Sequence, residues 1–189
     1  LHDALPICFF FALLFAKGTA RVMKLLGKKA TSMPGSWAII LCPDFLERMP
    51  RPKHIIGITG TNGKTTVSNM VEDVLTQCGY DFICNRSGSN VATGVASTLI
   101  ANSTLFGKPK KDLAVFELDE RSAPRILPFI KPDLLLCTNI FRDSYKRNAH
   151  VEFILDILST YIPDSTRLVL NADDLLCSSL KPQNRRVFF

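Results

Sequence analysis

The chain contains one short segment whose residue types and spacing can hold a phosphate group. An apolar run over residues 54–59 leads into a glycine-bearing turn and then a helical pattern, and the turn reads Gly60-Thr61-Asn62-Gly63-Lys64-Thr65-Thr66. Glycines let the backbone turn tightly, so that its N–H groups point at phosphate oxygens near the positive end of the helix dipole. We expect Lys64 to reach the β- and γ-phosphates and the Thr65 hydroxyl to bind Mg²⁺. The spacing therefore predicts that residues 60–66 bind ATP.

The segment differs from a strict phosphate-binding loop at one position. The strict pattern has Gly five residues before Gly63, where this chain has Ile58. Strand, turn, Lys-Thr pair and helix still follow in the required order, so we interpret the segment as a variant of the loop. A glycine turn that binds nothing is the weaker alternative. We expect Lys64 to be an exposed cation that makes few packing contacts.

A nucleotide bound with Mg²⁺ needs a carboxylate at the end of a neighbouring strand. The apolar run 113–116 ends at Glu117, with Asp119 and Glu120 just beyond it. Ligands of open α/β sheets bind at the carboxyl ends of the strands. Glu117 is therefore the predicted metal ligand and, with Lys64, the predicted catalytic residue. The alternative is a surface cluster of three acids without a function.

The apolar pattern predicts an α/β protein. Wholly apolar strands that alternate with short helices favour a mostly parallel sheet covered on both faces. We expect helices at 9–26, 65–77, 91–101, 122–130 and 149–161, and strands at 54–59, 81–84, 112–118, 133–138 and 167–170. The stretch 33–36, which carries Pro and Gly, and the stretch 49–52, which carries two Pro, are expected to break the chain.

The first 52 residues differ from the rest in charge. Residues 1–53 hold 8 Lys and Arg against 3 Asp and Glu, which is +5 of the total charge of +6. We predict a helical, basic leader at 1–52 and a nucleotide-binding domain at 53–189. Two interpretations of the leader remain open: it contacts an anionic membrane surface, or it is a solvated helix that covers part of the core.

The composition argues against several classes of protein. With 47% hydrophobic and 21% charged residues the chain is not disordered. Its longest apolar run, 7–16, is far shorter than the roughly 20 residues of a membrane-spanning helix. Six cysteines without a C-x-x-C pair lack zinc-ligand spacing and favour reduced thiols in a cytoplasmic protein. The basic excess lies outside the loop domain, so no nucleic acid partner is expected.

Several stretches resemble the Mur ligases, the ATP-dependent amide-forming enzymes of peptidoglycan synthesis. The loop 57–66 is similar to theirs, with Ile58 at the position of the missing glycine. Segments 86–97, 116–120 and 138–143 are most similar to the MurT-type subunits of lipid II isoglutaminyl synthase. The stretch 171–174 resembles the motif near the adenine. The likeness runs through most of the chain, in the same order.

The resemblance implies the fold of a Mur ligase central domain and a reaction. ATP would phosphorylate the α-carboxylate of D-glutamate in the lipid II stem peptide, at the inner face of the membrane. Ammonia from a GatD-type glutamine amidotransferase partner would then attack the acyl phosphate and give D-isoglutamine. The matching motif positions imply a role for four residues. Asn90 would lie in the loop that faces nucleotide and substrate, Asn171 would contact the adenine, and Thr65 and Glu117 would hold Mg²⁺.

Two other functions remain open. One is another Mur-type ligase that adds an amino acid, such as a relative of folylpolyglutamate synthase. The other is a nucleotide-binding module without turnover.

The sequence departs from the family pattern in three respects. Lys146 stands where the family has an acid three residues after Asp143, and Arg121 follows Glu120 where a small residue is commoner. The 189 residues contain neither the four-cysteine ribbon nor the C-terminal domain of the MurT-type subunit. The chain also begins with Leu, so we expect a piece of a longer protein that binds ATP without completing catalysis alone.

Overall fold

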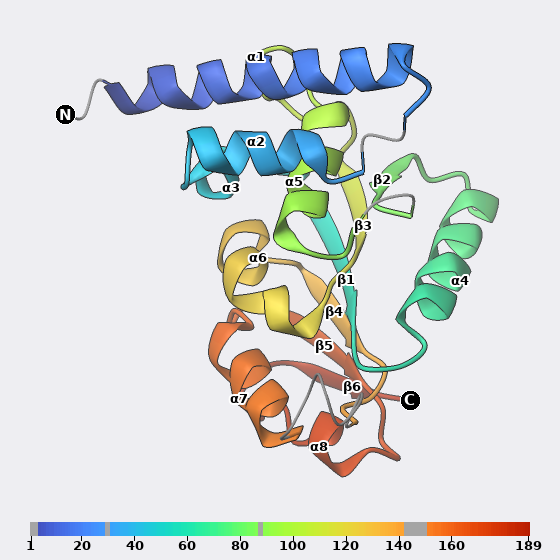
Figure 1. Cartoon of the computed structure of the whole chain (residues 1–189). Helices are drawn as coiled ribbons and strands as arrows, with labels where there is room; N and C mark the ends of the chain where they lie inside the picture. Colours follow the sequence, from blue (N-terminus) through green and yellow to red (C-terminus); the bar gives the residue numbers. More distant parts are fainter. Residues whose placement is uncertain (1–3, 29–30, 87–88, 142–150) are drawn as a thin grey trace.

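The computed structural model describes residues 4–28, 31–86, 89–141 and 151–189. In these ranges a parallel sheet carries helices on both faces (Figure 1). The strands are His54–Thr59 (β1), Phe82–Cys84 (β2), Leu113–Glu117 (β3), Leu134–Cys137 (β4), Arg167–Leu170 (β5) and Arg186–Phe188 (β6). Their order is β2-β3-β1-β4-β5-β6, and all neighbours are parallel. The predicted α/β class is confirmed.

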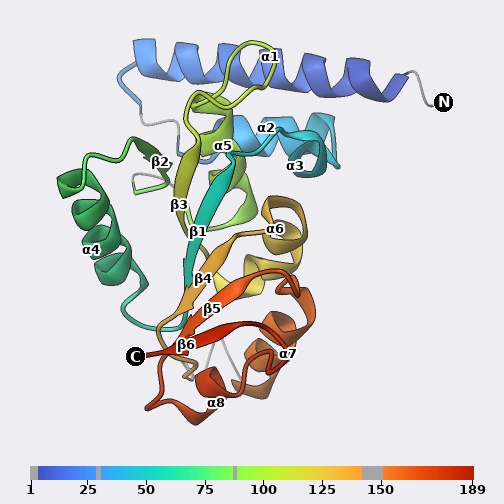
Figure 2. The same cartoon turned by 180° about the vertical axis from the view of Figure 1, so that it is seen from behind.

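Helices lie on both faces of the sheet and across one of its ends. They are Ala4–Leu25 (α1), Met33–Leu41 (α2), Phe45–Arg48 (α3), Lys64–Gln77 (α4), Ala92–Ala101 (α5), Ala123–Ile130 (α6), Val151–Tyr161 (α7) and Leu175–Ser178 (α8), with a 3₁₀ turn at Glu120–Ser122 (η1). Helix α4 lies on one face of the sheet, and α5, α6 and α7 lie on the other (Figure 2). Helices α1 and α2 lie across the end of the sheet where β1 and β3 begin (Figure 1).

Strand β1 lies inside the sheet, between β3 and β4, and most of its apolar side chains are buried. Ile55 and Ile58 are almost wholly buried between neighbouring elements. The register places Ile58 opposite Glu117 of β3 and Thr59 opposite Cys137 of β4. Since all three strands run in the same direction, their carboxyl ends meet where β1 leads into the loop. The sheet thus brings the loop, the end of β3 and the end of β4 together.

The stretch 33–36 does not break the chain as we expected, because it begins helix α2. Pro34 lies in the first turn, where a helix does not need the missing N–H group. Gly35 packs directly on α5: a Cβ atom there would lie 2.0 Å from the carbonyl oxygen of Thr93. Its N–H group donates to Ser97 Oγ at 2.8 Å. The Pro-Gly pair is therefore a close helix contact rather than a boundary.

The first 52 residues share their core with the sheet domain. Phe9 of α1 stacks on Phe45 of α3 with ring centroids 5.1 Å apart, and Leu13 is wholly buried. These side chains belong to the same apolar cluster as Ile100 and Phe116. The division at residue 52 remains a prediction. None of the helices in the described ranges has the length and apolar character that crossing a bilayer requires.

The predicted last strand, 167–170, is not the last one. Strand β6 pairs with β5, with Leu168 opposite Arg186. The basic residues in this segment concealed its strand character. Arg186 instead lies over the ring of Phe188, 5.3 Å from its centroid, and donates to the carbonyl oxygen of Ser178 at 3.0 Å. Its guanidinium group is therefore accommodated at the sheet edge without burying an unpaired charge.

Candidate nucleotide site

The loop between β1 and α4 depends on two glycines. Gly60 and Gly63 have φ angles of 120° and 79°, which residues with a Cβ atom rarely adopt. A Cβ atom on Gly60 would also lie 2.2 Å from Thr138 Oγ1. Helix α4 begins at Lys64, one residue before the predicted start. The first N–H groups of a helix have no acceptor within the helix. They can therefore donate hydrogen bonds to an anion that binds at this end.

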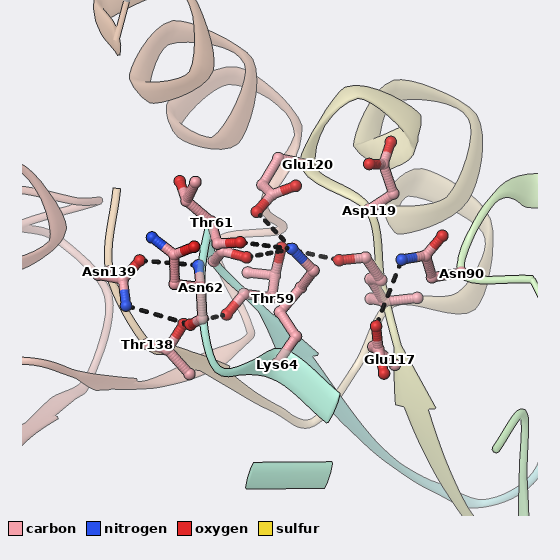
Figure 3. A network of polar contacts seen from close by, with 12 residues as sticks. Thr59, Thr61, Asn62, Lys64, Asn90, Glu117, Asp119, Glu120, Thr138 and Asn139 are labelled. Carbon is pink, nitrogen blue, oxygen red and sulfur yellow. Dashed lines mark hydrogen bonds and ion pairs between the residues drawn. The ribbon is translucent and has the colours of Figure 1, made fainter. Parts of the chain in front are cut away.

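The loop is held in shape by the segment that follows β4 (Figure 3). The N–H group of Thr61 donates to the Asn139 carbonyl oxygen, and that of Asn62 donates to Asn139 Oδ1, both at 2.9 Å. Thr138 Oγ1 donates to the Asn62 carbonyl oxygen at 2.7 Å. Sequence reasoning gave Thr138 and Asn139 no role of their own. They fix the loop before any ligand binds.

Lys64 is not the exposed cation that we expected. Its side chain is 14% exposed, and Nζ lies 3.1 Å from Glu120 Oε1 (Figure 3). Nζ also donates to the carbonyl oxygens of Thr61, at 3.2 Å, and Gly60. The side chain of Lys64 extends from the end of the loop toward the turn that follows β3, where Glu120 lies. The ammonium group is therefore held inside the loop, next to the place where phosphates are expected.

Glu120 is the acid that meets Lys64. Its side chain is 10% exposed in the turn η1. Burial raises the pKa of this carboxyl group, because the charged form loses its hydration, and the neighbouring Lys64 opposes that rise only in part. The sequence places Glu120 just beyond the strand that ends at Glu117 and gives it no role of its own. The contact depends on how the chain turns after β3, which the residue pattern does not reveal.

Glu117 is fixed at the end of β3 by two asparagines. Asn85 bonds its backbone twice: Oδ1 accepts from the Glu117 N–H at 2.9 Å, and Nδ2 donates to its carbonyl oxygen at 2.8 Å. Asn90 Nδ2 donates to Glu117 Oε1 at 3.3 Å (Figure 3). The structure therefore brings the predicted residues Asn90 and Glu117 together. It pairs Lys64 with Glu120 instead, and metal binding by Glu117 remains a prediction.

The oxygen atoms at this edge suit a Mg²⁺ ion that arrives with a nucleotide. Thr65 and Thr66 are exposed at the start of α4. Hydroxyl and carboxylate oxygens are hard ligands of the kind that Mg²⁺ prefers. In the described part of the chain, no three His, Cys, Asp or Glu side chains gather to hold a metal ion. The donors fit an ion that takes phosphate oxygens as its other ligands.

Asn171 and Asp174 support the segment that shapes the loop. Asn171 Nδ2 donates to the Thr138 carbonyl oxygen at 3.0 Å, and Asp174 Oδ2 accepts from the Ile140 N–H at 2.6 Å. Asp174 Oδ1 also accepts from two N–H groups at the start of α8. An Asp before an apolar run is typical of a helix cap, a signal that sequence reasoning missed. The adenine contact of Asn171 remains a prediction.

Of the two residues that depart from the family pattern, Arg121 lies within the described part of the chain and Lys146 does not. Arg121 is exposed in the turn η1. Lys146 and Asp143 lie outside the described residues.

Three comparisons relate the chain to known proteins. The Mur ligase middle domain model matches residues 58–188. The MurT subunit of lipid II isoglutaminyl synthase (glutamine-hydrolyzing) from Staphylococcus aureus strain COL is 36% identical over 172 residues, which are 90% of this chain and 38% of that protein. Its counterpart from Streptococcus pneumoniae strain ATCC BAA-255 / R6 is 34% identical over 87% of this chain and 36% of that protein. The chain thus spans little more than a third of these relatives.

A more distant relative and two solved structures extend the likeness. The UDP-N-acetylmuramoylalanine–D-glutamate ligase of Prochlorococcus marinus is 34% identical over 63% of this chain and 24% of that protein. MurF ligase from Thermotoga maritima, solved with ADP, is 18% identical with a TM-score of 0.59, covering 73% of this chain and 33% of that one.

A bifunctional folylpolyglutamate synthase/dihydrofolate synthase, solved with Mn, AMPPNP and L-glutamate, is 15% identical with a TM-score of 0.51. It covers 76% of this chain and 44% of that one. At these identities the two structures show a common fold. The middle-domain match covers more than half of the sequence and includes the loop and all the residues that shape it. The chain therefore belongs to the Mur ligase family.

Proposed function

We propose that the chain is the nucleotide-binding part of a lipid II isoglutaminyl synthase of the MurT type. The observation that carries the proposal is the preformed loop, whose two glycines and whose hydrogen bonds to Thr138 and Asn139 leave the start of α4 ready for phosphate. The reaction would be ATP-dependent amidation of the D-glutamate α-carboxylate in the lipid II stem peptide. The MurT proteins match 87% to 90% of this chain, whereas the D-glutamate ligase of Prochlorococcus marinus matches 63% of it, and this difference supports the choice among Mur ligases.

Each loop residue would have a distinct task. The N–H groups of Lys64, Thr65 and Thr66 would bind phosphate oxygens. Lys64 would turn from Glu120 toward the transferred phosphoryl group and offset the charge that develops on it. Thr65 and Glu117 would hold Mg²⁺. When bound, that ion would supply further positive charge at the phosphates.

A carboxylate needs activation before ammonia can form an amide with it. Transfer of the terminal phosphoryl group to the carboxylate oxygen would give an acyl phosphate and ADP, and ammonia would then displace phosphate. A GatD-type amidotransferase would supply the ammonia from glutamine, in the cytoplasm at the inner face of the membrane. The names of the MurT relatives imply a lipid II substrate and a partner subunit, and the GatD type of that partner is part of the proposal.

The test uses ADP release by the longest available form of the protein with Mg²⁺, ATP and lipid II. We expect release to depend on ammonia, or on glutamine when a GatD-type partner is added. The likeness to the D-glutamate ligases favours one second candidate, a ligase that adds an amino acid. Release that depends on D-glutamate, with UDP-N-acetylmuramoylalanine in place of lipid II and without ammonia, would support that candidate. ATP binding without ADP release would indicate a module without turnover.

A further inference from the structure

Helix α1 presents an apolar stripe on the side that faces away from the rest of the protein. Its members lie on one face of the helix, three or four residues apart except between Leu14 and Val22, where Gly18 occupies the same face. They are Ile7, Phe11, Leu14, Val22 and Leu25, with exposed fractions of 52% to 87%. Phe15 and Trp37 of α2 lie edge to face beside this stripe and are also exposed. The sequence of α1 contains no Asp or Glu.

A cationic pocket adjoins the stripe. It has a volume of about 520 Å³ and lies between α1 and the segment 100–110. Four cations line it, and they are Lys17, Arg21, Lys24 and Lys110. Within the described ranges, none of the four forms an ion pair with an acidic residue. The pocket therefore concentrates positive charge that no carboxylate of the described residues offsets.

Lys17 anchors the floor of this pocket. Its Nζ donates to the carbonyl oxygens of Ile100, at 2.6 Å, and Ser103, at 2.9 Å. Burial lowers the pKa of Lys17, and the nearby Lys110 and Arg21 lower it further. Cations that lie close together repel one another. An anion that binds among them relieves this repulsion and is therefore bound favourably. The exposed side chains of Leu105, on the pocket wall, and the adjacent Phe106 add apolar surface at the same place.

We propose that this face of α1 docks on an anionic phospholipid surface. The apolar stripe would enter the boundary between headgroups and acyl chains, and the pocket cations would bind headgroup phosphates. The inference deepens the proposed function, because a lipid-linked substrate requires the protein to work at a membrane. Helix α1 lies at the end of the sheet opposite the nucleotide loop (Figures 1 and 2). Docking would therefore leave that loop open to ATP from the water phase.

The charge pattern favours lipid over a second copy of this chain. Two copies meeting through this face would bring uncompensated cations close together, which raises the energy of the pair. A lipid surface supplies many phosphates and an apolar layer at the same depth, matching the row of cations along one edge of the stripe. An acidic protein partner would match the cations alone.

The test measures binding of the 189-residue chain to vesicles of phosphatidylcholine with and without phosphatidylglycerol. We expect binding only to the anionic vesicles, and we expect added salt to weaken it. Arg21→Gln with Lys24→Gln should weaken partitioning about 30-fold, since each cation near such a surface contributes about one kcal/mol. The matched control, Arg167→Gln with Arg185→Gln, removes two exposed cations elsewhere and should bind as the parent does. Leu14→Ser should weaken binding without changing charge.

Three results would overturn the inference. The first is equal vesicle binding by the two double variants. The second is binding of inorganic phosphate in the pocket without any binding to vesicles. The third is a dimer in sedimentation that Leu14→Ser dissociates. ATP affinity measured on the same samples separates the two proposals, because a parent chain that binds ATP but binds neither kind of vesicle refutes only the docking face.

Discussion

Lys64 and Glu120 form a largely buried ion pair, with Nζ and Oε1 3.1 Å apart and side chains that are 14% and 10% exposed. The pair joins the nucleotide loop to the turn after β3, two segments far apart in the sequence. Removing one member of a buried pair leaves an uncompensated charge, whereas removing both does not. The pair thus links the stability of the fold to the residue that is expected to bind phosphate.

Glu120→Gln should change how stability depends on pH. Burial raises the pKa of Glu120 above its ordinary value of 4.5. Between that value and the raised pKa, the native state binds more protons than the unfolded chain, so the free energy of unfolding falls as pH rises through this window. The glutamine variant should lack this fall. Urea unfolding of both proteins from about pH 4 to about pH 8 measures it, and parallel curves would contradict the assignment.

Lys64→Ala should destabilise the protein by about 2 kcal/mol, because Glu120 then stays buried without a cation. The double variant Lys64→Ala with Glu120→Gln should regain most of that loss. Chemical unfolding of the parent, both single variants and the double variant gives the coupling between the two positions. Strictly additive effects would show that the contact contributes nothing to folding.

Gly35→Ala should destabilise the protein by about 2 kcal/mol or more, since the new methyl group meets the Thr93 carbonyl oxygen at 2.0 Å. Gly18→Ala is the matched control: it lies in α1 with nothing within 4 Å of the new atom, and it should stabilise by about 0.5–1 kcal/mol. Thermal unfolding of both variants measures the opposite signs. A neutral Gly35→Ala would mean that α2 and α5 are not packed closely.

Glu117→Gln should make nucleotide binding much less dependent on Mg²⁺. The amide keeps the size of the side chain and removes the charge that would help to hold the ion. Titrating Mg²⁺ at fixed ATP, with affinity read by calorimetry, compares this variant with Asp119→Asn. Asp119 serves as the control because its carboxylate caps the start of η1 by accepting a hydrogen bond from the N–H group of Ser122. If Asp119→Asn has the larger effect, the metal ligand has been assigned to the wrong residue.

The sequence was sufficient for the parts of the site that are local. Strand β1, the glycine loop and helix α4 follow one another directly, so residue types and spacing predicted them. The pairing of Lys64 with Glu120 escaped prediction, because it depends on the turn that follows β3. The same holds for Asn139, which is 77 positions from Asn62 and bonds it only because β1 and β4 are neighbours.

Other gaps arose from residues that have two structural uses. Pro34 and Gly35 are frequent at chain breaks, yet here one starts a helix and the other allows close packing. Arg186 conceals a short edge strand because its charge is unusual inside a sheet. In both places tertiary contacts decide the outcome, and a local pattern does not contain them.

The most direct measurement is the calorimetric titration of the chain with ATP in the presence of Mg²⁺. The parent protein and Glu120→Gln should both bind, because the loop and Lys64 are intact in each. The double variant Lys64→Ala with Glu120→Gln should fold, as unfolding curves can verify, and should lose most of its affinity for ATP. Equal ATP affinity in the double variant and Glu120→Gln would contradict the assignment of residues 60–66 as the nucleotide site.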